Sequence, residues 1–280
     1  MLDYNNSSFN QEAFKGDSST LIILHGWRSS KEKWQAVREN LERRGVRVII
    51  PDLPGFKEET ELNEVWDLDD YVEWFEKFSS CCCEPSSMRD EARRFRSSSK
   101  NSELFHRSTS RNSNLRFFLL GHSFGGRIAI KYTAKNPEKV KGLILVSSAG
   151  IKHKKTFRQN LLFQMAKAGN KFSFLPFFNF LRKVFYKFIV KEKDYPEAKG
   201  YLKETFKKII SEDLTRHLEQ IKPPTLIIWG EKDKMTPISD AYLMSEKIKN
   251  SKLKVLKNIG HLPYRETPKK LSEIIIDFLR

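Results

Sequence analysis

The chain has 280 residues, enough for one large α/β domain with a sizeable core, and its 51 Lys and Arg residues against 35 Asp and Glu residues give a formal net charge of +16. No stretch approaches the roughly 18 consecutive apolar residues that span a bilayer, and the opening residues lack the cationic start and apolar run of a signal peptide. These features argue against an integral membrane protein and predict a cytoplasmic one.

Short apolar runs bounded by turn residues recur along the chain, each of a length typical of a buried parallel strand. The predicted strands are Leu21–Leu24, Val46–Ile50, Leu115–Leu120, Leu143–Val146, Thr225–Trp229 and Leu253–Leu256. The predicted helices are Lys31–Arg44, Asp67–Phe78, Phe124–Lys135, Ile238–Lys249 and Pro268–Leu279. This alternation predicts a doubly wound α/β fold, in which a mostly parallel sheet carries helices on both faces.

Two stretches interrupt the alternation and divide the predicted fold. Residues 79–113 contain 11 Ser and seven Lys or Arg with few apolar residues, so burial cannot repay the entropy of ordering them, and we expect a disordered insertion. Residues 151–221 lie between two predicted strands and have helical periodicity, which predicts a helical cap over the carboxyl edge of the sheet. Residues 1–150 and 222–280 then form the core domain, with the insertion inside it.

The cysteines give no sign of a disulfide framework or a metal centre. Cys81, Cys82 and Cys83 are consecutive, so they cannot join distant parts of one chain. No His or Cys residues are spaced as zinc ligands. We therefore expect no bound metal.

The pentapeptide Gly121-His122-Ser123-Phe124-Gly125 follows a predicted strand and opens a predicted helix, which is the context of a nucleophile elbow. Such a turn holds its serine in a strained backbone conformation, and glycines on either side remove the Cβ atoms that would collide. The sequence therefore predicts Ser123 as a nucleophile. A Gly-rich strand-to-helix turn without a catalytic role is the alternative.

A serine is a weak nucleophile until a positioned base takes its proton, so the elbow predicts a histidine and a carboxylate further along the chain. His261 follows the last predicted strand, and Asp233 follows the strand before it. The chain order is then Ser, Asp, His. Glu231 and Asp240 lie close enough in the sequence to Asp233 to remain alternative acids.

The first predicted strand ends in the turn His25-Gly26-Trp27. Such a turn can direct the backbone N–H of Trp27 to the same point as that of Phe124. Two donors aimed at one point would form an oxyanion hole, in which one donor is typically worth roughly 100- to 1,000-fold in turnover. A tight turn that binds no ligand is the alternative, and the Trp27 indole would then line an acyl pocket.

Together, the HG turn, the GHSFG elbow, the loop WGEKD and the turn NIGH resemble the α/β-hydrolase superfamily, in its serine-nucleophile, helical-cap, esterase- and lipase-like branch. The resemblance covers the chain apart from residues 79–113 and implies an α/β-hydrolase fold with a cap inserted after the family's sixth strand. It also implies no cofactor, because such a triad needs only water and its own side chains. Two departures stand out: little room for the antiparallel hairpin that usually starts the fold, and Lys57-Glu58 where a glycine is common.

The superfamily includes many reactions on one framework. Because Ser123 stands where its dehalogenases and epoxide hydrolases carry an aspartate, we expect a serine hydrolase that cleaves a carboxylic ester or thioester with an apolar acyl part through an acyl-enzyme. A carbon–carbon bond hydrolase of meta-cleavage-product type and a carrier-protein-dependent methyl esterase are the enzymatic alternatives. A scaffold used only for binding is the non-enzymatic alternative, and it predicts no reaction of Ser123 with a fluorophosphonate.

Basic residues are concentrated in the predicted cap. Residues 151–210 hold 15 Lys or Arg against four acidic residues, and Lys171–Lys191 adds eight aromatic side chains without an acid. A cap helix that covers the substrate, a helix that binds an anionic membrane surface, and a docking surface for an acidic carrier protein are the three interpretations. For the last, residues 25–27 and 52–56 resemble pimeloyl carrier-protein methyl esterases. Nucleic acid is not expected, because no recognised nucleic-acid module is present.

Overall fold

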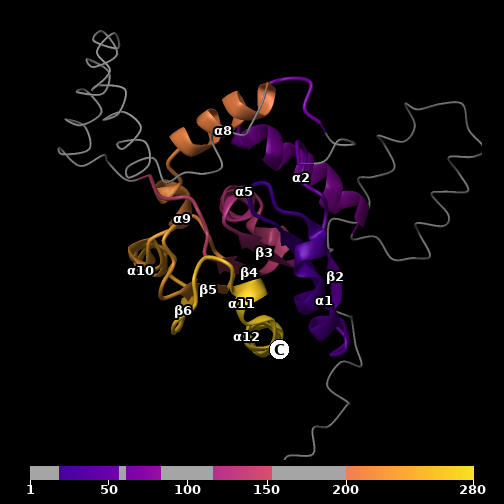
Figure 1. The fold of residues 1–280 in the computed structure, drawn as a ribbon, viewed down its shortest axis with the longest axis vertical. Helices are drawn as coiled ribbons and strands as arrows, with labels where there is room; N and C mark the ends of the chain where they lie inside the picture. Colours follow the sequence, from indigo (N-terminus) through magenta and orange to yellow (C-terminus); the bar gives the residue numbers. More distant parts are fainter. Residues whose placement is uncertain (1–18, 57–60, 83–115, 153–199) are drawn as a thin grey trace, which may run out of the picture.

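A computed structural model describes residues 19–56, 61–82, 116–152 and 200–280 of the chain (Figure 1). Most of the predicted insertion, with Cys83, lies outside the described residues. The same holds for most of the predicted cap, including the basic aromatic stretch Lys171–Lys191 on which the membrane and carrier-protein interpretations depend.

The described residues form one six-stranded sheet in which every neighbouring pair is parallel, as the sequence predicted. The strands are β1 (Thr20–Leu24), β2 (Arg47–Ile49), β3 (Phe117–His122), β4 (Val140–Val146), β5 (Thr225–Gly230) and β6 (Ser251–Leu256). Their order across the sheet is β2-β1-β3-β4-β5-β6. The sheet reverses its order between β1 and β3, and ligands of doubly wound folds bind near such a reversal, beyond the carboxyl ends of the strands.

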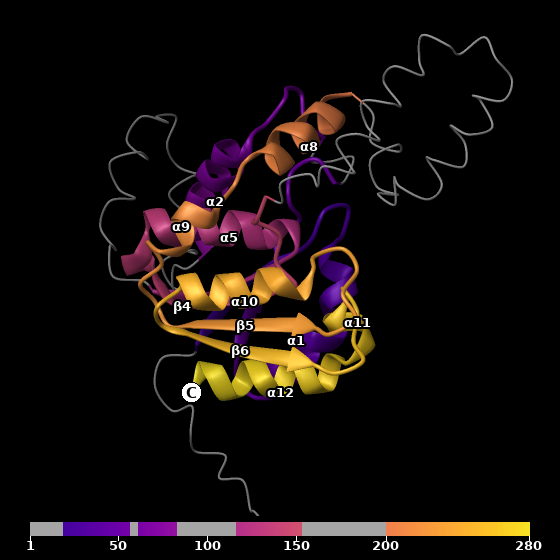
Figure 2. The same cartoon turned by 90° about the vertical axis from the view of Figure 1, so that its left-hand side faces the viewer.

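Helices cover both faces of this sheet (Figures 1 and 2). The helices are α1 (Gln35–Glu42), α2 (Leu68–Cys82), α5 (Phe124–Lys135), α8 (Tyr201–Ser211), α9 (Thr215–Leu218), α10 (Ile238–Lys247), α11 (Pro263–Glu266) and α12 (Pro268–Leu279), with 3-10 turns at Lys31–Trp34 and Pro137–Lys139. One core cluster joins the sheet to α2, α5, α9 and α10, and the other joins it to α1, α11 and α12. Burial of these apolar faces on both sides of central strands is the main stabilising contribution to the fold.

Three of the predicted helices end at other residues than the sequence predicted. Helix α10 ends at Lys247, two residues before the predicted Lys249. The segment expected as one helix over Lys31–Arg44 starts as the 3-10 turn and continues as α1 only to Glu42, because Gly45 takes a left-handed conformation (φ 81°) that ends the helix. Helix α2 continues through Cys82 into the segment expected to be disordered from residue 79. Ser79 is buried there, with its hydroxyl bonded to the Glu76 carbonyl and close to the Tyr132 hydroxyl, so packing extends the helix.

The predicted third strand, Leu115–Leu120, lies two residues further along, at Phe117–His122. Gly121 and His122 are therefore the last residues of β3, and Ser123 is the first residue after it. Of the predicted cap, residues 200–221 are described. They contain α8 and α9, and Figure 1 shows α8 running beside α2.

Candidate active site

Each segment predicted to carry chemistry follows the carboxyl end of a strand. The His25-Gly26-Trp27 turn follows β1, and Ser123 follows β3. Asp233 follows β5 and His261 follows β6. In Figure 2 the heads of the β5 and β6 arrows point to the loops that lead to α10 and α11. Because all the strands are parallel, these segments share one edge of the sheet.

Ser123 has the backbone strain expected of a nucleophile elbow. Its φ of 51° and ψ of −115° are unusual for a residue with a Cβ atom, and it is partly exposed between buried neighbours. A Cβ atom on Gly125 would collide with the Leu24 carbonyl, and one on Gly121 would lie 2.6 Å from the Gly125 carbonyl oxygen. Only glycine fits at these two positions, so the sequence encodes the close approach that the turn needs.

Main-chain hydrogen bonds join the elbow to the end of β4. The Ser123 N–H donates to the Val146 carbonyl at 3.2 Å, and the Ser123 carbonyl accepts the N–H groups of Gly126 and Ala149, each at 3.0 Å. These bonds resist relaxation of the strained residue. The hydroxyl is thereby held at the turn between strand and helix.

His261 and Asp233 form a close pair. The imidazole Nδ1 lies 2.8 Å from Asp233 Oδ2, and the two side chains are 9% and 0% exposed. Burial alone would raise the pKa of Asp233, but hydrogen bonds and charge from His261 and hydrogen bonds from Thr236 outweigh it and lower the pKa. The carboxylate is therefore ionised at neutral pH and accepts the Nδ1 hydrogen. Nε2 of a neutral His261 then has the free lone pair that a general base needs.

The two alternative acids are bonded elsewhere. Glu231 accepts the Asn258 N–H at 2.9 Å, and Asp240 is buried at the start of α10 beside Ser239. Among the described contacts, neither makes a hydrogen bond to His261. The geometry favours Asp233 as the partner of the imidazole.

Ser123 and His261 lie near one another without a direct bond. His122, which precedes the serine, has its ring centroid 5.1 Å from that of His261. Among the described residues, no hydrogen bond joins the Ser123 hydroxyl to His261. In structures without substrate this contact is often long and shortens only when the substrate binds.

The turn after β1 lies against the elbow. A Cβ atom on Gly26 would lie 3.3 Å from the Ser123 Cβ. The Gly26 carbonyl accepts hydrogen bonds from His25 Nδ1 at 2.9 Å and from the Ser29 N–H at 3.1 Å. Because a trans peptide is planar, the N–H of Trp27 points the opposite way from this carbonyl.

His25 holds that turn in place through hydrogen bonds to the backbone. It is fully buried, and burial lowers its pKa, so the ring is neutral at pH 7. With its hydrogen on Nδ1, its Nε2 accepts the Leu53 N–H at 3.2 Å and so joins the loop after β2 to the turn after β1. The second predicted oxyanion donor, Phe124, is the first residue of α5, where N–H groups have no partner within the helix.

Two positioning residues escaped the sequence analysis. Thr236 Oγ1 donates to Asp233 Oδ2 at 2.8 Å, while the other carboxylate oxygen accepts the N–H groups of Met235 at 2.8 Å and Thr236 at 3.0 Å. The Glu266 carboxylate bonds main-chain N–H groups on both sides of His261. Asp side chains often bond backbone groups two or three residues further along the chain. The position of Thr236, three residues after Asp233, was therefore the one indication in the sequence that these two residues would be bonded.

The loops that carry Asp233 and His261 touch through their backbones. Gly230 ends β5, and a Cβ atom there would collide with the carbonyl of Gly260, the residue before His261. In addition, the Lys232 N–H donates to the Ile259 carbonyl at 2.8 Å. The distance between Asp233 and His261 is thus fixed by main-chain contacts.

Aromatic side chains form one wall beside the elbow. The Trp27 ring lies 4.9 Å from that of Phe56, 5.2 Å from Phe124 and 4.8 Å from Phe206, between ring centroids. Phe206 belongs to α8, so a described part of the predicted cap reaches this wall. Such a surface favours an apolar group next to Ser123.

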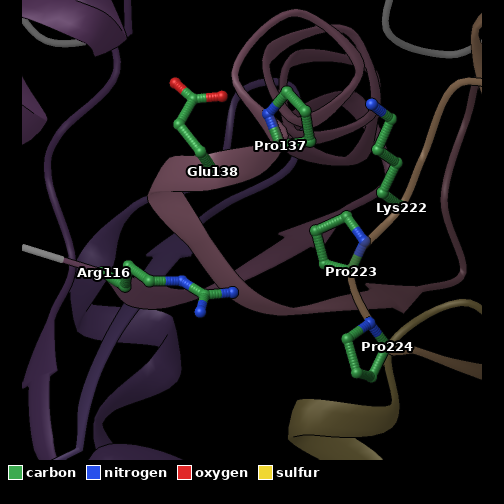
Figure 3. A pocket seen from close by; sticks show the side chains of 6 residues that line it. All are labelled: Arg116, Pro137, Glu138, Lys222, Pro223 and Pro224. Carbon is green, nitrogen blue, oxygen red and sulfur yellow. The ribbon is translucent and has the colours of Figure 1, made fainter. Parts of the chain in front are cut away.

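A surface pocket of about 380 Å³ lies at the opposite edge of the sheet (Figure 3). Its lining residues are Arg116, Pro137, Glu138, Lys222, Pro223 and Pro224, which precede β3, β4 and β5. The lining holds no serine, cysteine or histidine side chain, and the amino edge is not where doubly wound folds bind their substrates. The pocket is therefore separate from the candidate active site.

Within the described ranges, no group of three or more His, Cys, Asp or Glu side chains is arranged to hold a metal ion. In the same part of the chain, no helix is both long and apolar enough to cross a bilayer.

Residues 21–274 match the model of the alpha/beta hydrolase family. The chain belongs to this family. It is thus an enzyme of hydrolase type, and the predicted fold class is confirmed.

Two curated relatives and one solved structure illustrate the likeness. Monoacylglycerol lipase ABHD6 of Homo sapiens is 26% identical over 285 residues, which cover 94% of this chain and 76% of the relative. Lipase 1 of Psychrobacter immobilis is 26% identical over 261 residues, covering 88% and 72%. The crystal structure of bromoperoxidase from Bacillus anthracis superposes with a TM-score of 0.63 at 20% identity, covering 94% of this chain and 92% of that one, and so shows the shared fold.

Proposed function

We propose that this hydrolase cleaves a carboxylic ester or thioester with an apolar acyl part, through an acyl-enzyme on Ser123. The observation that carries the proposal is the buried 2.8 Å contact between His261 and Asp233 beside an elbow that holds Ser123 at a φ of 51°. The aromatic wall around Trp27 supports an apolar acyl group, and the likeness to two relatives, a monoacylglycerol lipase and a lipase, supports an ester bond.

In the proposed first step, Nε2 of His261 accepts the proton of the Ser123 hydroxyl as its oxygen attacks the substrate carbonyl carbon. The carbonyl oxygen becomes an oxyanion, which accepts hydrogen bonds from the N–H groups of Trp27 and Phe124. His261 then gives its proton to the leaving alcohol or thiol, and the bond to the leaving group breaks. Asp233 stabilises the imidazolium and keeps the hydrogen on Nδ1.

The second step repeats this sequence with water. His261 accepts a proton from water as the water oxygen attacks the acyl carbon, and the oxyanion forms again at the same donors. Return of the proton to the Ser123 oxygen releases the carboxylic acid. One base with one tautomer therefore serves both halves of the reaction.

The experiment that tests the proposal compares the unmodified chain with Ser123→Ala on p-nitrophenyl esters of graded acyl length. We expect turnover by the unmodified chain and a loss of at least about 1,000-fold in kcat in the variant. Ser211→Ala changes an exposed serine of α8 and should behave like the unmodified chain. A fluorophosphonate should label the unmodified chain and Ser211→Ala but not Ser123→Ala.

Two outcomes would contradict the proposal. One is full turnover by Ser123→Ala. The other is a chain that reacts with neither the esters nor the fluorophosphonate. A chain labelled at Ser123 that cleaves a vinylogous diketone but no ester would instead support the carbon–carbon bond hydrolase.

A further inference from the structure

The main chain around His261 is held by two side chains from other parts of the sequence. His122 Nε2 lies 3.0 Å from the His261 carbonyl oxygen. The Glu266 carboxylate accepts the N–H of Gly260 at 2.9 Å and the N–H of Leu262 at 3.3 Å. Asp233 thus fixes the ring of His261, while His122 and Glu266 fix its backbone.

The chemistry of the contact sets its direction. A carbonyl oxygen only accepts, so His122 Nε2 must carry the hydrogen and donate it. His122 is 2% exposed, and burial together with the nearby His261 lowers its pKa to about 3, which keeps the ring neutral at pH 7. Its Nδ1 is then an acceptor, and it has no hydrogen-bond partner among the described residues.

Packing alone does not account for an imidazole at this position. A phenylalanine ring would fill a similar volume without leaving a buried nitrogen unpaired, which costs stability. The His122 ring packs edge-on against Tyr264, with centroids 5.0 Å apart, and a Cβ atom on Gly26 would lie 3.0 Å from its Nδ1. These close neighbours leave the ring little room to turn, so the donor stays aimed at the His261 carbonyl.

We propose that His122 is a positioning residue that sets the separation between Ser123 and His261, with Glu266 holding the same loop from its other side. The inference rests on the proposed function, in which Ser123 and His261 exchange a proton. Because Ser123 follows His122 directly, a shift of the elbow moves the base with it. Loss of the bond leaves substrate binding intact but reduces the population in which hydroxyl and imidazole are aligned, so kcat falls while KM stays.

Two amide variants test whether the hydrogen bond from His122 to the His261 carbonyl is needed, or whether any polar side chain at position 122 suffices. The side-chain nitrogen of His122→Gln reaches about as far from the backbone as Nε2, whereas that of His122→Asn reaches only as far as Nδ1. For kcat on a p-nitrophenyl ester we expect His122→Asn to lose about 10- to 100-fold, the usual effect of a small misplacement of reacting groups. His122→Gln should retain most of the activity, with KM unchanged in both. The rate of fluorophosphonate labelling should follow kcat.

A second part of the experiment changes an exposed residue, so the variant does not disturb the packing of the core. Glu266 is exposed, so Glu266→Gln should fold, yet its amide offers one acceptor oxygen and can no longer bond both N–H groups. We expect a fall in kcat in this variant too, with KM unchanged. Arg265→Gln alters the neighbouring exposed residue and should leave kcat unchanged.

The positioning role is overturned if His122→Asn and Glu266→Gln keep the kcat of the unmodified chain. It is also overturned if His122→Gln loses as much kcat as His122→Asn. Both results presuppose an active, labelled parent chain, so they leave the proposed function standing. Failure of the parent chain to label or turn over would instead remove the proposed function and, with it, this inference.

Discussion

Asp233 uses both carboxylate oxygens, one for His261 and Thr236 Oγ1 and the other for the backbone. In Asp233→Asn one amide oxygen remains to accept hydrogen bonds, so the loop should keep its shape. The amide no longer provides the negative charge that stabilises the imidazolium, and it favours the wrong tautomer. We expect kcat to fall about 1,000- to 10,000-fold in ester hydrolysis, with unchanged thermal stability.

The matched control for this prediction is Glu231→Gln. Glu231 lies in the same loop, but its contact is to the Asn258 N–H, which an amide oxygen can still accept. We expect kcat close to that of the unmodified chain. Equal losses of kcat in Asp233→Asn and Glu231→Gln would contradict the proposal that Asp233 orients His261.

Thr236 gives a finer test of the same carboxylate. Thr236→Val keeps the shape of the side chain and deletes the hydroxyl that lies 2.8 Å from Asp233 Oδ2. Hydrogen bonds to charged groups contribute about 1.5–3 kcal/mol, so we expect roughly a 10-fold lower kcat because the carboxylate is less firmly held. Thr236→Ser retains the hydroxyl and should recover most of the loss, and a Ser variant as poor as the Val variant would contradict this explanation.

The sequence singled out Asp233 and His261 but not the residues that hold them. Asp233 and His261 are predictable because parallel strands deliver their carboxyl ends to one edge. Thr236 and Glu266 depend on the conformation of the loops, which no periodicity in the sequence reports. The preference for Asp233 over Glu231 likewise depends on the conformation of the loop after β5, in which both residues lie.

At the scale of elements, α8 is anchored to α5 by a buried cation. The Arg127 guanidinium donates to the carbonyl of Ile209 at 2.7 Å and to that of Glu212, at the carboxyl end of α8. Lys131, one turn further along α5, bonds Glu212 at 2.7 Å and Asp69 of α2 at 2.8 Å. Since α8 also carries Phe206, this anchor sets where the aromatic wall lies relative to Ser123.

Arg127→Met should therefore loosen α8. The variant leaves carbonyls at the end of the helix without their buried donor, at a cost of about 1–3 kcal/mol in the free energy of unfolding. We expect faster amide hydrogen exchange in α8 and a higher KM for long-chain esters. The measurements are urea denaturation, hydrogen exchange and ester kinetics.

Lys207→Met provides the control for that prediction. Lys207 belongs to the same helix and pairs with Glu204 at 2.6 Å, but both side chains are about half exposed. An exposed pair of this kind contributes about 0–1 kcal/mol, so we expect little change in stability or exchange. An equal effect of the two variants would show that Arg127 has no special place in the anchor.

Element positions were predictable where the apolar pattern is long and regular. The helices Phe124–Lys135 and Pro268–Leu279 have the predicted bounds, and all six strands overlap their predicted ranges, although β3 lies two residues further along. The extension of α2 through Cys82 was not predictable, because serine and cysteine have modest helix propensity and the extension depends on the buried contact of Ser79 with Tyr132. Propensity yields to tertiary packing at such boundaries.

For the whole molecule, buried neutral histidines predict a loss of stability in mild acid. The folded-state pKa of His122 lies at about 3, below the ordinary value of 6.5 that an unfolded chain would show, because burial disfavours the charged ring. Between these values the unfolded state binds the extra proton, so the free energy of unfolding decreases as the pH falls through this window. From pH 7 to pH 5 the loss from His122 is on the order of 2 kcal/mol. Burial lowers the pKa of His25 as well, which acts in the same direction.

Urea denaturation at pH 7 and pH 5 tests this linkage. We expect the difference in unfolding free energy between the two pH values to be smaller in His122→Phe than in the unmodified chain, whatever the absolute stability of the variant. Comparison of differences removes contributions from the carboxylates, which both proteins share. Identical differences would mean that His122 is not buried in its neutral form.

The backbone contact between Gly230 and Gly260 constrains how this enzyme can change. Any side chain at Gly230 would push apart the two loops that carry Asp233 and His261. A change of backbone conformation in either loop, by evolution or by design, therefore requires a matching change in the other loop. A redesign for new specificity should therefore exchange residues 230–236 and 258–266 together, and should place its other changes in the aromatic wall around Trp27.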